Sequence, residues 1–133
     1  MSEIIWVNGC FDLLHIGHIE LLKFAKSLGG LVYVGIDSDV RIQEYKGKDR
    51  PYQNQHTRMT ILESIKYVDK VMIFDTSYQL QCLVENFSPK AMVIGEEYKY
   101  KEIIGSQFCD NIIFFPRLGE HSTTNILNKI NNN

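Results

Sequence analysis

The sequence predicts a single α/β domain built around a five-stranded parallel sheet, and three observations support this. Short runs of β-branched and other apolar residues alternate with segments whose apolar residues recur at helical spacing. The short runs are almost continuously apolar, as in strands that are buried on both faces of a parallel sheet. Glycines and chemically active side chains follow these runs, and in such folds ligands bind beyond the carboxyl ends of the strands.

The elements follow in chain order. Five apolar runs are predicted as strands: residues 4–7, 31–36, 71–74, 91–94 and 112–115. Four segments are predicted as helices: 17–28, 57–68, 78–86 and 123–130. Segment 45–54 contains Gly47 and Pro51 among charged residues and is predicted to be a loop over the crevice. The domain is expected to cover residues 1–130, with 131–133 as a frayed tail.

Length and composition limit the class of protein. The chain has 133 residues, 44% hydrophobic and 23% charged, which suits one compact core and is too short for two ordinary domains. The formal net charge of −2 provides no general basic surface for nucleic acid. No run of about 18 apolar residues could span a bilayer, and no secretory signal pattern is visible. We therefore expect a cytoplasmic protein that binds a small anion and neither nucleic acid nor membrane.

The cysteines indicate neither disulfides nor a metal site. Cys10, Cys82 and Cys109 are odd in number and widely spaced, with no CxxC pair. They are predicted to be free thiols.

The first motif carrying chemistry lies directly after the first strand. It reads Asn8-Gly9-Cys10-Phe11-Asp12-Leu13-Leu14-His15-Ile16-Gly17-His18, a glycine turn that leads into a helix. A helix N-terminus offers unpaired N–H groups and a partial positive charge, to which His15 and His18 add donors on one face. Gly17 lacks a Cβ that would block a phosphate. The segment therefore predicts an anion site.

Two further groups suit phosphate. Ser122, Thr123 and Thr124 open the last predicted helix, and Arg117 precedes them, so that hydroxyls, N–H groups and a guanidinium form a second cradle. A basic group consists of Lys46, Lys48, Arg50 and Arg58. By itself such a group would be a solvated surface.

The first motif resembles the HxGH signature of the nucleotidyltransferase α/β phosphodiesterase superfamily, and the resemblance covers nearly the whole chain. It implies a Rossmann-like three-layer sandwich. Two branches are similar: the small cytidylyltransferases, such as glycerol-3-phosphate cytidylyltransferase, and the adenylyltransferase domain of ADP-heptose synthase. The stretch from Arg117 to Thr124 resembles the RTEGxSTT motif of cytidylyltransferases, although Leu118-Gly119-Glu120-His121 replaces its usual middle.

The resemblance also implies roles for individual residues. His15, His18, Lys46 and Arg117 are expected to stabilise the triphosphate during transfer, with Lys48 as an alternative to Lys46. Arg58 begins a stretch similar to R-x-x-I-L-E…Y-V-D and is expected to contact phosphate. The segment Gly95-Glu96-Glu97-Tyr98 is expected to lie at the base of the nucleotide, where Glu97 would accept a hydrogen bond from an exocyclic amine. Asp12 is expected either to anchor the turn or to lie at the acceptor, and Asp39 is expected at the acceptor. The full expected nucleotide-binding set is Gly9, Cys10, Phe11, Gly17, Arg58, Gly95, Glu97, Ser122, Thr123 and Thr124.

The expected reaction is in-line attack of an acceptor phosphate oxygen on the α-phosphorus of a nucleoside triphosphate, with pyrophosphate leaving. A divalent cation such as Mg²⁺ is expected, held mainly by the triphosphate and water, with no protein metal cage. The first expectation is CMP transfer from CTP to a small phosphoalcohol such as glycerol 3-phosphate, which would form a CDP-activated building block for surface polysaccharide.

Several alternatives stay open. Asn8-Gly9, the Lys46 loop and Ser122-Thr123-Thr124-Asn125-Ile126 resemble the heptose branch, which would use ATP and heptose 1-phosphate. The HIGH spelling of residues 15–18 also occurs in class I aminoacyl-tRNA synthetases, but KMSKS, an anticodon-binding domain and a basic surface are missing. A non-catalytic nucleotide-binding module would keep the fold but lack the phosphate-binding residues. The resemblance further suggests a homodimer.

Overall fold

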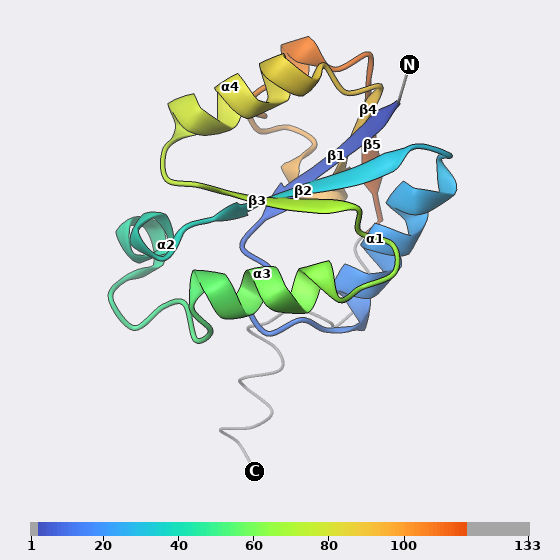
Figure 1. Ribbon diagram of the computed structural model, residues 1–133. Coiled ribbons are helices and arrows are strands. Elements are labelled where there is room, and N and C mark those ends of the chain that lie inside the picture. Colours follow the sequence, from blue (N-terminus) through green and yellow to red (C-terminus); the bar gives the residue numbers. More distant parts are fainter. Residues whose placement is uncertain (1–2, 117–133) are drawn as a thin grey trace.

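The protein forms a three-layer α/β/α sandwich, and the computed structural model describes residues 3–116 (Figure 1). The strands are β1 (Ile4–Gly9), β2 (Leu31–Asp37), β3 (Lys70–Phe74), β4 (Ala91–Gly95) and β5 (Asn111–Phe115). The α-helices are α1 (Ile16–Ser27), α2 (Asp39–Lys46), α3 (Gln55–Glu63) and α4 (Ser77–Phe87). Two short 3₁₀ turns, η1 (Glu96–Tyr98) and η2 (Ser106–Phe108), lie between β4 and β5. The helix predicted at 123–130 lies outside the described residues.

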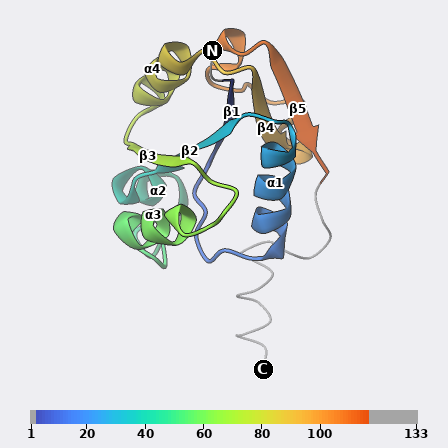
Figure 2. The same ribbon diagram turned by 45° about the vertical axis from the view of Figure 1, so that its right-hand side comes forward.

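All five strands are parallel, in the order β3-β2-β1-β4-β5. The chain therefore winds outward from β1 in both directions, first through β2 to β3 and then through β4 to β5. Helices α1 and α3 cover one face of the sheet and α4 covers the other, as Figures 1 and 2 show. The predicted five-stranded parallel sheet and single-domain sandwich are confirmed. Ligands in such sheets bind at the point where the winding reverses, here between β1 and β4.

Two apolar clusters hold the layers together. On one face, Leu22 and Ala25 of α1 and Leu62 of α3 pack against alternate residues of the central strands. On the other face, Trp6 of β1 and Val84 of α4 lie in a second cluster with Phe74, Leu80 and Met92. Burial of both sheet faces explains why the sequence of each inner strand is nearly continuously apolar.

Helix α2 occupies a segment in which no helix was predicted. It is eight residues long and mostly polar, so hydrophobic spacing does not reveal it. Its ends are nevertheless well defined, because the Ser38 hydroxyl accepts from the Arg41 N–H at 3.2 Å and Gly47 ends the helix with φ +94°.

Helix α3 ends at Glu63, five residues before the predicted end at 68. Ile65 and Val68 continue the apolar spacing because they pack against the core from the turn that follows. The cysteines are free thiols, as predicted. Within residues 3–116, no helix has both the length and the apolar character needed to cross a membrane.

Candidate active site

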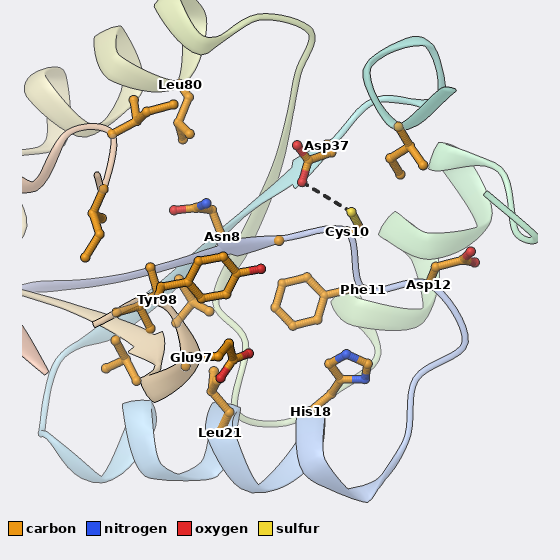
Figure 3. A pocket seen from close by; sticks show the side chains of 18 of the residues that line it. Asn8, Cys10, Phe11, Asp12, His18, Leu21, Asp37, Leu80, Glu97 and Tyr98 are labelled. Carbon is orange, nitrogen blue, oxygen red and sulfur yellow. Dashed lines mark hydrogen bonds between the residues drawn. The ribbon is translucent and has the colours of Figure 1, made fainter. Parts of the chain in front are cut away.

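A cavity of about 650 Å³ lies where the carboxyl ends of β1, β2 and β4 meet the N-terminus of α1. It is within the size range of small-molecule sites. Predicted site residues in its wall are Gly9, Cys10, Phe11, Asp12, His15, Gly17, His18, Lys46, Gly95 and Glu97. Residues as far apart in the sequence as Gly9 and Glu97 are thus brought together at one cavity. Figure 3 shows this wall, with His18 and Glu97 on the same side of the Phe11 ring.

The two histidines cap the first turn of α1 reciprocally. Nδ1 of His15 accepts a hydrogen bond from the Gly17 N–H at 3.0 Å, and Nδ1 of His18 accepts one from the His15 N–H at 3.2 Å. Their ring centroids are 3.9 Å apart. Because each Nδ1 is an acceptor, the neutral ring must carry its hydrogen on Nε2. Both imidazoles are therefore held as Nε2–H donors at a helix N-terminus, where anions bind.

His18 is neutral at physiological pH. Burial, followed by the proximity of His15, lowers its pKa from 6.5 to about 4. The side chain consequently acts on a phosphate as a positioned hydrogen-bond donor and not as a full cation.

This lowered pKa predicts a specific acid sensitivity. Between pH 6.5 and 4 the unfolded chain protonates His18 while the folded chain does not, so stability is lost as the pH falls through this window. Between pH 7 and pH 4, the unfolding free energy of the wild-type protein should fall by about 2–3 kcal/mol more than that of His18→Asn. The asparagine amide oxygen can still accept the cap hydrogen bond, but it does not titrate. Urea unfolding across this range provides the measurement, and parallel curves would contradict the expectation.

The turn before α1 is strained and tied to a distant loop. Phe11 and Leu13 adopt positive φ values of 52° and 54°, which non-glycine residues seldom do outside functional sites. The buried Asp12 carboxylate accepts from the N–H groups of Tyr52 and Gln53 at 2.8 and 3.0 Å. In Figure 3 its oxygens point away from the centre of the cavity. Asp12 thus holds the two loops together, and its expected contact with the acceptor stays a prediction.

Arg58 is fully buried, against the backbone of the wall residues Cys10 and Asp37. Its Nη1 donates to the carbonyls of Cys10 and Asp37, both at 2.8 Å, and its Nη2 pairs with Asp39 at 2.8 Å. Its Nε donates to the Gln53 carbonyl at 2.9 Å. Neither Arg58 nor Asp39 belongs to the cavity wall as described. Both charged groups are engaged with protein atoms, and their expected phosphate and acceptor contacts stay predictions.

The basic loop does reach the cavity. Lys46, the last residue of α2, lines it, whereas Lys48 is not among the lining residues. Arg50 also lines the cavity, stacked on Tyr52 with its Nε 3.7 Å from an Asp12 oxygen. That Nε is buried and has no hydrogen-bond partner among residues 3–116. The geometry therefore favours Lys46 over Lys48 and adds Arg50 as a cation facing an anion site.

The wall at β4 suits the base of a nucleotide. A Cβ on Gly95 would lie 2.5 Å from a carboxylate oxygen of Glu97, so a glycine is needed for Glu97 to fold back over the strand end. Tyr98 also lines the cavity, and burial, followed by the charge of Glu97, raises the pKa of its phenol. The remaining predicted residues, Arg117, Ser122, Thr123 and Thr124, lie outside the described residues.

Asp37 and Arg41 line the cavity although they were not among the predicted site residues. Asp37 ends β2, and its Oδ1 accepts from Arg41 Nε at 2.7 Å. Its Oδ2 accepts from the Cys10 thiol at 3.6 Å, and burial, followed by the Asp37 charge, raises the Cys10 pKa to about 11. The position of Asp37 after a strand was a usable signal. Nothing in the sequence marked Arg41 as a site residue, since it is a single cation on a short polar helix.

Three features together are typical of the HxGH nucleotidyltransferase superfamily: the doubly wound sheet, the cavity at its switch point and the imidazole donors at a helix N-terminus. The family model described as cytidylyltransferase-like matches residues 6–128. The chain belongs to this cytidylyltransferase-like family.

Curated relatives match almost the whole chain. A bifunctional protein HldE of Campylobacter fetus is 39% identical over 129 residues, 97% of this chain and 28% of the relative. A second bifunctional protein HldE, from Helicobacter pylori (strain ATCC 700392 / 26695), is 38% identical over 129 residues, with the same coverage. The chain therefore spans somewhat over a quarter of the length of these relatives.

Solved structures share the fold. A lipopolysaccharide core biosynthesis protein from Thermoplasma volcanium aligns with a TM-score of 0.67 and 21% identity, covering 89% of this chain and 98% of that one. Pantoate-beta-alanine ligase from Francisella tularensis aligns with a TM-score of 0.65 and 20% identity, covering 96% and 65%. At this level of identity the likeness concerns the fold alone.

Proposed function

We propose that the chain transfers AMP from ATP to a sugar 1-phosphate, with heptose 1-phosphate as the first candidate, and releases pyrophosphate. Two findings support this reading over CMP transfer from CTP. The relatives named HldE point to the heptose branch, and the loop Lys46-Gly47-x-x-Arg50-Pro51 resembles that branch. The CTP preference expected first from the sequence receives no comparable support.

The transfer chemistry rests on one observation, the pair of capped imidazoles beside the cavity. Each presents an Nε2–H donor fixed by the reciprocal cap, so no reorganisation is needed when charge builds on the phosphoryl oxygens. Lys46 and Arg50 add positive charge from the loop. The attacking phosphate oxygen of the acceptor is already anionic, so the protein's task is alignment and charge stabilisation, with no general base.

The residues present also fit a cation carried by the substrate. Among residues 3–116 no three His, Cys, Asp or Glu side chains gather as a metal-ligating group. We therefore propose that Mg²⁺ is held mainly by triphosphate oxygens and water. When bound, such an ion neutralises charge on the phosphate oxygens.

Pyrophosphate release tests the proposal. With Mg²⁺ present, ATP and CTP are each combined with heptose 1-phosphate, glycerol 3-phosphate and other sugar phosphates. We expect kcat/KM to be at least about tenfold higher for ATP with heptose 1-phosphate than for any CTP combination, since a difference in how the pocket fits a purine or a pyrimidine ring is worth at least about 1–3 kcal/mol.

Faster release with CTP and glycerol 3-phosphate would overturn the choice of nucleotide and acceptor. No release with any combination, together with measurable binding of ATP, would favour a nucleotide-binding module without transferase activity.

A further inference from the structure

We propose that Asp37 and Arg41 form the subsite that reads the hydroxyl groups of the acceptor. This inference rests on the proposed function, because it names the part of the sugar phosphate that the cavity recognises. Asp37 stands at the carboxyl end of β2 and Arg41 in the first turn of α2. Their side chains are 16% and 10% exposed, and both line the cavity.

Arg41 is fixed in place and retains hydrogen-bond donors. Its Nε donates to Asp37 at 2.7 Å and its Nη2 donates to the Ser77 hydroxyl at 3.2 Å. The rings of Tyr45 and Phe74 lie 5.0 and 5.2 Å from the guanidinium carbon. Nη1 makes no hydrogen bond to any residue between 3 and 116, although it carries two hydrogens. A rigid donor of this kind in a cavity wall suits an oxygen of a ligand.

Asp37 retains acceptor capacity beside these donors. Among residues 3–116, its Oδ2 receives only the weak thiol donor of Cys10, at 3.6 Å. The phenol of Tyr98 lies near enough for the Asp37 charge to contribute to its raised pKa, after burial and Glu97. Donors and acceptors therefore stand side by side in one part of the wall.

This combination favours hydroxyl groups over a second phosphate. Asp37 and Arg41 form an ion pair without net charge, so the pair gives little electrostatic preference for an anion. A hydroxyl both donates and accepts, and therefore matches a carboxylate next to a guanidinium. The exposed ring of Tyr45 at Arg41 adds an apolar surface, which suits the carbon skeleton of a sugar.

The position of the pair fits the acceptor and not the triphosphate. In Figure 3, Asp37 and Cys10 lie on one side of the Phe11 ring, and His18 lies on the other. An acceptor whose phosphate reaches the histidines would extend its body toward Asp37. The two carboxylates first expected at the acceptor are engaged elsewhere, Asp12 with the backbone of the basic loop and Asp39 with Arg58.

Steady-state kinetics of Arg41→Lys and Asp37→Asn test the subsite. Lysine keeps a charge beside Asp37 but lacks the planar donors, and asparagine keeps the size of the aspartate. With ATP, each variant should raise KM for heptose 1-phosphate about 10- to 100-fold, as expected when hydroxyl partners are lost. The KM for ATP and the inhibition constant of inorganic phosphate, which competes for the acceptor's phosphate position, should change less than about threefold.

Gln43→Ala, an exposed change on the same helix outside the cavity wall, is the control and should leave every constant unchanged. Circular dichroism of each variant verifies folding, and Asp37→Asn carries the test if Arg41→Lys does not fold. An unchanged KM for heptose 1-phosphate would overturn the inference, as would a parallel rise in the phosphate inhibition constant. If the wild-type protein transfers AMP to no sugar phosphate, the proposed function itself fails. If the wild-type protein is active but the KM values of the two variants do not change, only the assignment of the subsite fails.

Discussion

Replacing His15 with asparagine should lower kcat by about 100-fold or more while changing the unfolding free energy by less than about 0.5 kcal/mol. Asparagine is among the best N-cap residues, so its side-chain oxygen can take over the bond from the Gly17 N–H that Nδ1 now accepts. It has no group at the position of Nε2. The substitution therefore separates the capping role of Nδ1 from the role proposed for Nε2 at the triphosphate.

His15→Ala is the matched variant, because it removes the cap and the donor together. It should lose a similar amount of activity and also about 1 kcal/mol of stability. Single-turnover kinetics with ATP and heptose 1-phosphate, beside urea unfolding of both variants, provide the measurement. Full activity in His15→Asn would show that the residue is a helix cap and nothing more.

The largest loss of stability is expected from Arg58→Met. The buried guanidinium makes four hydrogen bonds, and its removal leaves the Asp39 carboxylate and three carbonyls without this partner. Breaking a buried ion pair in this way costs about 3–5 kcal/mol of unfolding free energy. Chemical denaturation should show this as a lower midpoint with an unchanged slope.

Lys66→Met provides the control, since Lys66 is an exposed cation shortly after α3, and the change should stay within about 0.5 kcal/mol. The same variants also decide between two roles for Arg58. If Arg58→Met is stable but has a strongly raised KM for ATP, the arginine contacts phosphate, as its sequence motif first suggested.

Much of the fold was predictable because burial on both sheet faces leaves a direct mark in the sequence. The strand at 31–36 is apolar at nearly every position, and it is β2 in the structure. Helix α2 was not predictable from spacing, since among its residues only Arg41 and Ile42 are buried. The end of α3 was misplaced because Ile65 and Val68 reach the core from a turn, with the same spacing that a helix would give.

The site was predictable where residues belong to one motif. His15, Gly17 and His18 lie together because a helix turn places residues three apart on one face. The direction of a lone cation was not predictable. Arg58 and Arg50 stand in the same basic group, yet one is buried among protein oxygens and the other faces the cavity. That difference depends on where the strand ends lie in space, which no local pattern encodes.

The network around Arg58 has a consequence for redesign of substrate choice. One guanidinium joins the backbone after β1, at Cys10, to the backbone after β2, at Asp37. Asp12 adds a second link to the loop at residues 52 and 53. A loop exchange that removed Arg58 or Asp12 would leave backbone groups of the other two loops without these partners. Segments 8–18, 37–46 and 50–58 therefore form one transplantable unit, and new acceptors are best engineered by moving all three together.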